Sequence, residues 1–145
     1  MGYVASIYFA NMKIHKINHW DKGAASINSF SKSIDNKYLF VCDYDGGVAV
    51  IDIYSGDLSD DFNIKNARMS VVTFDNQFLI ICQYYEDGSG NIEKYSIQSK
   101  ELVAVLDKHK DYVYSMSCSY DNIFVFLGFD DGTVQIVHID NFVTI

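Results

Sequence analysis

The chain repeats itself about every 43 residues, and this period constrains its fold more than any other feature of the sequence. The pair Asp-Asn opens the same short segment three times, at residues 35–36, 75–76 and 121–122. An apolar run of aromatic and β-branched residues follows each pair, at residues 38–42, 78–82 and 124–127. Because both faces of these runs are apolar, each predicts a strand that is covered on both sides.

Each unit also contains signals for further strands. Asp45-Gly46 and Asp131-Gly132 predict tight hairpin turns after the first run, and Gly90 ends a longer loop at the same place. An alternating segment, a second turn and a short strand come next, which gives four strands per unit. We therefore expect one domain, a single partial array whose units are residues 1–24 (incomplete), 25–66, 67–110 and 111–145.

The period and the motifs of the last unit resemble those of WD repeats, which are about 40–45 residues long. Residues 106–109, Leu-Asp-Lys-His, are similar to the Leu-x-Gly-His that starts a WD repeat. Residues 119–122 resemble its Ser-Pro-Asp-Gly turn, and residues 131–136 its Asp-Gly-Thr-Val-x-Ile strand. The resemblance implies an all-β fold of WD-repeat β-propeller blades, each with four antiparallel strands. There are about three and a half blades, which form an incomplete ring.

The same resemblance implies structural roles for a few polar and glycine residues. In the family, a turn Asp, a loop His, a strand Ser or Thr and a Trp form a buried relay. Two members of this relay are matched here, by Asp131 and His109, and Gly132 follows Asp131 in its turn. In the first full unit only the Asp45-Gly46 turn remains. We expect a buried hydrogen bond between Asp131 and His109, with apolar packing holding the blades elsewhere.

The number of units raises a question about closure. Propellers close with about 4 to 8 blades, and a half-ring leaves two apolar blade faces in water. The alternatives are a fragment of a longer protein, a chain completed by another chain, or an unusually small ring. We favour a fragment or a chain inside an assembly.

No motif for catalysis, cofactor binding or metal binding occurs in the sequence. The sequence contains no nucleotide-binding loop, no serine hydrolase or zinc protease motif and no Cys-x-x-Cys. We therefore expect a protein that is not an enzyme and has no cofactor. His15 and His19 share a strand face but have no third ligand nearby. Cys42 and Cys82 recur at one register of the repeat, where a small buried residue fits; a redox pair is the alternative.

Charge and hydropathy exclude some classes of partner. The chain has 19 acidic and 11 basic residues and a net charge of −8, so we expect no direct binding of nucleic acid. The longest apolar runs are far shorter than the roughly 20 residues of a membrane-spanning helix, so we expect no membrane association. Three widely spaced cysteines without a recognisable signal peptide favour a reduced, cytoplasmic location.

One segment carries a more specific resemblance. Residues 90–101, Gly-Asn-Ile-Glu-Lys-Tyr-Ser-Ile-Gln-Ser-Lys-Glu, are similar to the Gly-x-Leu-x-x-Tyr-Ser-x-x-Ser-Gly-Glu of subunit i of translation initiation factor 3. Residues 35–38 and 66–70 resemble two further segments of that family. The resemblance implies a non-catalytic scaffold that docks other subunits of a multi-protein complex near the small ribosomal subunit.

Two tyrosines are candidate contacts for such a partner. Tyr84 and Tyr85 lie at the end of a strand and before the longest loop, and exposed tyrosines on a propeller rim are typical docking residues. Two other functions stay open at this point. One is an adaptor of another intracellular complex in RNA processing, signalling or trafficking, and the other is a propeller enzyme with an axial metal site.

Overall fold

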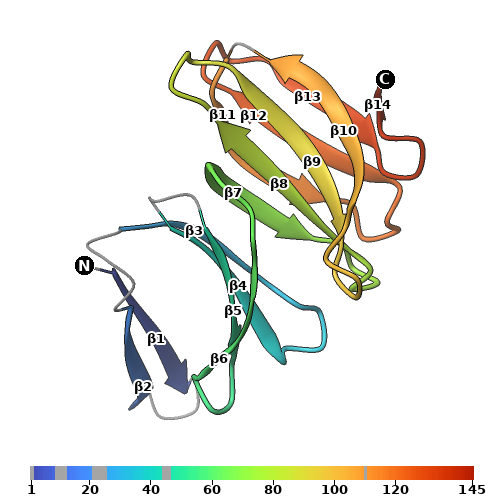
Figure 1. Ribbon diagram of the computed structural model, residues 1–145. Helices are drawn as coiled ribbons and strands as arrows, with labels where there is room; N and C mark the ends of the chain where they lie inside the picture. The colour runs from blue at the N-terminus through green and yellow to red at the C-terminus, as the bar shows by residue number, and fades with distance from the viewer. Residues whose placement is uncertain (1, 9–12, 21–25, 44–46, 110) are drawn as a thin grey trace.

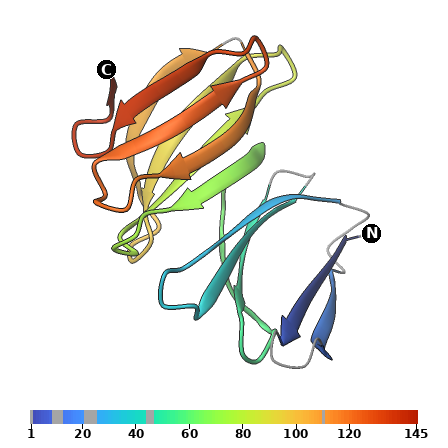
Figure 2. The same ribbon diagram turned by 180° about the vertical axis from the view of Figure 1, so that it is seen from behind.

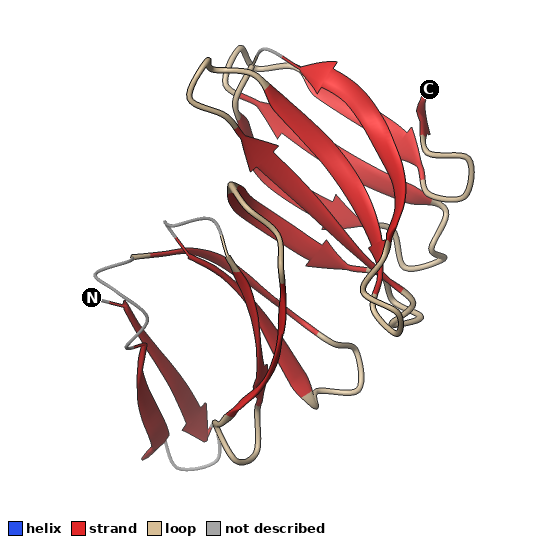
Figure 3. Cartoon of the chain, viewed as in Figure 1, coloured by secondary structure: helices blue, strands red, loops and turns tan. Residues whose placement is uncertain are grey.

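The chain folds into β-sheets alone wherever its structure is described (Figure 3). A computed structural model describes residues 2–8, 13–20, 26–43, 47–109 and 111–145. One hairpin and three four-stranded antiparallel sheets account for its strands. The predicted all-β fold of four-stranded antiparallel sheets is confirmed.

In every sheet each strand pairs with its neighbour in the chain. The hairpin joins β1 (Gly2–Tyr8) and β2 (Lys13–Trp20). The first four-stranded sheet consists of β3 (Ile27–Lys32), β4 (Tyr38–Asp43), β5 (Val48–Asp52) and β6 (Leu58–Phe62). The second consists of β7 (Ala67–Val72), β8 (Phe78–Tyr84), β9 (Gly90–Ser96) and β10 (Leu102–His109). The third consists of β11 (Val113–Cys118), β12 (Phe124–Phe129), β13 (Val134–His138) and β14 (Val143–Thr144).

The three four-stranded sheets follow one another as blades of an incomplete ring (Figure 1). Their first strands lie next to one another, with β7 in contact with both β3 and β11. Seen from behind, the sheet β11–β14 lies in front of β7–β10 (Figure 2). In both views the β1–β2 hairpin lies on the side of the first sheet that faces away from the second.

The apolar core lies between the sheets rather than at the centre of any one of them. Phe40, Cys42 and Val48 of the first sheet pack against Leu79 and Ile81 of the second, and all five side chains are at most 1% exposed. The opposite face of the second sheet packs against the third in the same way. That core contains Ile80, Cys82, Ile92, Val125, Leu127 and Val137. The predicted covering on both faces is confirmed for β4 and β8, but β12 is covered on one face alone, since Phe126 is 37% exposed.

The Asp-Asn pairs form one turn that is built three times between the first and second strands of a sheet. In the second sheet, the Asp75 Oδ1 atom accepts hydrogen bonds from the Thr73 hydroxyl (2.6 Å) and the Gln77 N–H (3.0 Å). Asn76 adopts a left-handed φ of 59°, which asparagine tolerates better than most residues. Asn36 and Asn122 occupy the equivalent positions with φ of 58° and 61°.

These asparagines also join neighbouring sheets. The Oδ1 atom of Asn76 accepts a hydrogen bond from the Ile34 N–H in the preceding turn (2.7 Å). Asn122 accepts one from the Asp75 N–H (3.1 Å), which lies one position further along its turn than Ile34 does in the first. We call this bond the asparagine staple; it links each turn to the one before it and fixes the spacing of the sheets at one end.

The asparagine staple can be tested by replacing Asn76 with glycine, which keeps the left-handed turn but removes the acceptor. We expect Asn76→Gly to lower the free energy of unfolding by about 1 kcal/mol more than Asn36→Gly. Asn36 is a matched control because it has nearly the same φ, and its Oδ1 atom accepts a hydrogen bond from the exposed Lys32 side chain of its own sheet rather than from another turn of the described chain. Urea denaturation of both variants measures the difference, and equal losses would contradict the role of the staple.

Candidate interaction surface

Tyr84 lies inside the molecule at the junction of the second and third sheets. Its side chain is 6% exposed, and its ring stacks on Tyr112 with centroids 4.5 Å apart. The hydroxyl accepts a hydrogen bond from the buried Val113 N–H and donates one to the Asp111 carbonyl (3.2 Å). Burial raises the pKa of Tyr84, so the hydroxyl keeps its proton for this donation. The prediction that Tyr84 is an exposed partner contact is wrong, because the third sheet covers it.

Tyr85 is half-buried and bonded within its own sheet. Its hydroxyl donates to Gln83 Oε1 (2.7 Å) and accepts from Asn91 Nδ2 (3.2 Å). Burial, followed by the nearby carboxylate of Glu93, raises its pKa. Tyr85 therefore supports the β8–β9 loop, and its predicted role as a partner contact stays a prediction.

The exposed aromatic rings at this junction come from the third sheet instead. Tyr112 is 50% exposed and Tyr114 is 71% exposed. Strand β11 carries an irregularity in its pairing between Val113 and Ser115, which places Tyr114 at a β-bulge. Bulges redirect side chains away from the regular pleat. Sequence analysis missed this pair because a bulge leaves no clear signal in the alternation of apolar residues.

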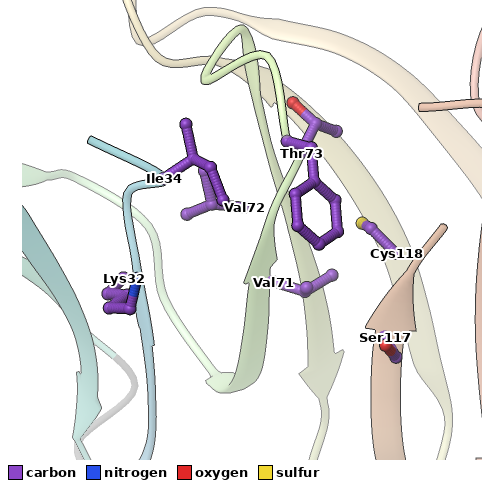
Figure 4. Close-up of a pocket in the computed structure, with 8 residues that line it drawn as sticks. Lys32, Ile34, Val71, Val72, Thr73, Ser117 and Cys118 are labelled. Atoms are coloured by element: carbon purple, nitrogen blue, oxygen red, sulfur yellow. The ribbon is translucent and has the colours of Figure 1, made fainter. Parts of the chain in front are cut away.

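A cleft of about 210 Å³ opens where the first strands of the three sheets meet (Figure 4). Lys32 and Ile34 line it from the first sheet, Val71 and Thr73 from the second, and Cys118 from the third. The volume is below the roughly 300–1,000 Å³ that is typical of small-molecule sites. The cleft is therefore sized for a side chain or two of a partner rather than for a cofactor.

The polar relay expected from the sequence requires a buried Asp131, and the structure does not bury this side chain. Asp131 is exposed, and its Oδ1 atom accepts hydrogen bonds from the Thr133 hydroxyl (2.6 Å) and N–H (2.8 Å). These bonds hold the pKa of Asp131 below its usual value. The burial predicted for Asp131 is wrong, because it satisfies its own turn at the surface. The side chain of His109 lies outside the described residues, so the pairing itself stays a prediction.

The predicted turn glycines have different outcomes. Gly132 lies in the turn before β13 with a φ of 85°, in the left-handed region that glycine adopts without strain, and its role as a WD-repeat position stays a prediction. Asp45 and Gly46 lie outside the described residues, as do the side chains of His15 and His19. The structural role implied for the Asp45-Gly46 turn therefore stays a prediction.

Lys94 is a buried cation that sequence analysis did not single out. Its side chain is 3% exposed, and Nζ donates hydrogen bonds to the carbonyls of Ile139 (2.6 Å) and Asp140 (3.2 Å) in the third sheet. It also lies 5.0 Å from the ring centroid of Phe78 and 5.2 Å from that of Phe142. Burial lowers the pKa of Lys94, although the carboxylate of Asp140 opposes this effect. The ammonium group joins the second sheet to the third. Its only signal in the sequence was a lysine at the repeat position where the other units have Val50 and Ile136.

The three cysteines are buried thiols outside any disulfide, in the cores between sheets. Burial raises the pKa of both Cys82 and Cys118 to about 12, and it also raises that of Cys42. Cys42 and Cys82 recur as small strand residues of the core, as the sequence predicts. Within the described part of the chain, no group of three His, Cys, Asp or Glu side chains could hold a metal ion. No helix among those same residues has the length and apolar character needed to cross a membrane.

Comparison with known proteins agrees with this geometry. Residues 100–138, which run from the turn before β10 to the end of β13, match the WD40 family, described as WD domain, G-beta repeat. The three four-stranded sheets have the fold of WD40 propeller blades. The solved WD40 repeats of RRP9 superpose with a TM-score of 0.71 at 14% identity over 84% of this chain. At that identity the likeness shows the fold alone.

Two further results limit what the comparison supports. The chain covers 38% of the RRP9 chain, so it corresponds to well under half of that propeller structure. No curated protein sequence matches the chain. The WD-repeat resemblance found in the sequence is therefore supported for the repeat and the fold, and the similarity to subunit i of translation initiation factor 3 stays a prediction.

Tyr84 provides a test of how the second and third sheets are joined. We expect Tyr84→Phe to lower the free energy of unfolding by about 1–3 kcal/mol, because it leaves the buried Val113 N–H without its acceptor. Tyr85→Phe is the matched control, since its hydroxyl bonds the Gln83 and Asn91 side chains of its own sheet, and it should cost less. Chemical denaturation gives both values, and a smaller loss for Tyr84→Phe than for Tyr85→Phe would contradict this account.

The thiols can be tested by their reactivity. We expect Cys42 and Cys82 to react with Ellman's reagent at pH 8 far more slowly than free cysteine, since only the thiolate attacks and burial suppresses it. Cys118, which lines the cleft, should be modified first. Mass spectrometry of the modified protein assigns the sites, and denatured protein provides the three-thiol end point. Rapid modification of Cys42 or Cys82 in the folded protein would favour the redox alternative.

Proposed function

We propose that this protein is a non-catalytic interaction scaffold of WD-repeat type that works in the translation machinery as a component similar to subunit i of initiation factor 3. The observation that carries the proposal is the segment at residues 90–101, whose Tyr-Ser core resembles that family. In the fold this segment forms β9 and the turn after it, where Tyr95 and Ile97 pack against the core between the first two sheets. The resemblance thus concerns residues that build the blade, and partners would contact other surfaces.

The surface that best fits a protein partner is the tyrosine patch, which we define as Tyr112 and Tyr114. Tyrosine rings combine apolar area with a polar hydroxyl and are enriched where proteins dock. The ring of Tyr112 is held in place by its stack on Tyr84, so it loses little freedom on binding. The net charge of −8 favours a basic protein surface as the complement. The proposed location is the cytoplasm, where such a complex would assemble.

An adaptor role in another intracellular complex is the second candidate. The same blades and the same tyrosine patch would serve it, because a propeller fold hosts many different partners. The identity of the captured proteins distinguishes the two candidates, so the test below depends on which proteins are recovered.

Affinity capture with the tagged chain tests the proposed function. We expect subunits of initiation factor 3 and proteins of the small ribosomal subunit among the captured proteins identified by mass spectrometry. Tyr114→Ala should reduce their recovery at least several-fold, since exposed aromatic anchors carry much of the energy of an interface.

Tyr54→Ala is the matched control for this capture. Tyr54 is 72% exposed, nearly the same as Tyr114, but it lies in the turn after β5 of the first sheet. Its replacement should leave recovery unchanged. Capture of a defined complex without any initiation factor would favour the adaptor role, and equal losses for both variants would remove the tyrosine patch from the proposal.

A further inference from the structure

The cleft where the first strands meet is complete within the described chain. Its 8 lining residues lie on β3, β7 and β11 or in the turns that follow these strands, so no further sheet is needed to form it. Figure 4 shows Ile34 and Val72 on one side of the cleft and Ser117 and Cys118 on the other. Phe74 and the valines give it an apolar wall. The cleft is therefore a preformed apolar recess that belongs to these three sheets.

A row of apolar side chains continues from the cleft along the turns of the three sheets. The residue directly before each Asp-Asn pair is Ile34, Phe74 or Tyr120. Ile34 is 44% exposed and Tyr120 is 83% exposed, and the ring centroids of Phe74 and Tyr120 lie 5.1 Å apart. We call these three residues the turn row. Solvent-exposed turns favour polar residues, so an apolar side chain at one turn position of all three units indicates a surface that another molecule covers.

Exposed carboxylates accompany the turn row. Asp35, Asp75 and Asp121 each follow one of its members directly. A hydrogen bond from the serine hydroxyl of its own turn is the largest cause that lowers the pKa of Asp35, and the same holds for Asp121, so both are charged at neutral pH. The carboxylate of Asp75 adds to the effect of burial in raising the pKa of Cys118, which places this charge close to the cleft wall. The surface therefore joins apolar side chains with negative charge.

The charge of this surface favours a basic occupant. Lys32 also lines the cleft, but it is an exposed residue whose Nζ donates a hydrogen bond to Asn36 Oδ1 (2.6 Å). The three carboxylates outweigh this single cation, so arginine and lysine side chains are the favoured neighbours of an apolar group in the cleft. A second copy of the chain is disfavoured as the occupant, because each copy carries a net charge of −8.

We propose that the cleft and the turn row bind an extended segment of a partner protein in which a bulky apolar residue is flanked by arginine or lysine. The apolar side chain would fill the cleft, whose volume is about 210 Å³, and the basic side chains would face Asp75 and Asp121. The tyrosine patch lies near the start of β11, whereas Ser117 and Cys118 lie at its end. The inference therefore concerns a different surface from the tyrosine patch and does not rest on the proposed function.

A short symmetric peptide tests this pairing of apolar and basic groups. Its sequence, Gly-Ser-Arg-Leu-Arg-Ser-Gly, reads the same in both directions, so the test does not depend on the orientation of the bound segment. We expect saturable changes in the amide NMR signals of Ile34, Asp75 and Cys118 when this probe is added to the isotope-labelled chain. Replacing its leucine with serine should weaken binding at least about tenfold, because the apolar anchor is lost. Replacing both arginines with glutamates should abolish binding.

Paired carboxylate variants test the role of charge. We expect Asp75→Asn combined with Asp121→Asn to weaken binding of the probe about fivefold. Asparagine keeps the Oδ1 atom that accepts the hydrogen bonds of each turn, so the turns should stay intact. Asp87→Asn combined with Asp131→Asn is the matched control, because it removes the same charge from exposed turn carboxylates at the opposite ends of the second and third sheets. This control should leave the affinity unchanged.

A filling variant tests the cleft itself. Ser117 lines the cleft and is exposed, so Ser117→Leu should occupy part of the cleft and block the probe without removing a core side chain. Ser59→Leu is the matched control, since Ser59 is exposed on β6 of the first sheet, and it should leave binding unchanged. Thermal unfolding of both variants checks that each retains the cooperative transition of the unchanged chain.

Several results would overturn the proposal. The probe would not bind, or its signal changes would lie away from the cleft and the turn row. The serine or glutamate version of the probe would bind as well as the original. In either matched pair, the variant and its control would change the affinity equally. Finally, sedimentation would show a dimer that Ser117→Leu dissociates, which would assign the cleft to a second copy of the chain.

Discussion

The structure depends on one repeated contact, the packing of the apolar face of one four-stranded sheet against the next. The two larger apolar clusters each lie between two of these sheets. Phe40 and Cys42 are buried only because the second sheet covers them, and Val125 and Leu127 lie between the second and third sheets. Burial of apolar surface between sheets supplies the driving force, and the strand hydrogen bonds within each sheet keep its two faces apart. A repeat of this kind is stable only as a stack.

Polar groups then set how the stacked sheets align. The asparagine staples at Asn76 and Asn122 recur once per sheet and join consecutive turns. Tyr84 and Lys94 occur once each, and both cross from the second sheet to the third. The first junction has other polar contacts, between the Ser31 and Ser70 hydroxyls (3.0 Å) and between the Lys100 ammonium group and the Asp60 carboxylate. At two positions of the polar relay, Leu127 and Val137 are packed in the apolar core instead.

The sequence predicted the parts of the fold that depend on local pattern. Alternation and turn signals located the strands, and the repeated Asp-Asn marked the turns between first and second strands, although the bond from Asn76 to the preceding turn was not foreseen. Residue roles that depend on neighbours were less predictable. Tyr84 was expected at the surface, because nothing in its own segment indicates that the third sheet covers it. Asp131 was expected to be buried, but its turn satisfies its carboxylate in solvent.

The repeat, the four strands of each unit and the all-β class follow from the amino-acid pattern, because period, alternation and turn chemistry act within about 43 residues. Tertiary structure alone decided which side chains are covered, because the same repeat position is buried at Val48 and exposed at Val134. The physical reason is that a strand pattern specifies two faces, whereas exposure depends on whether another sheet lies against each of them.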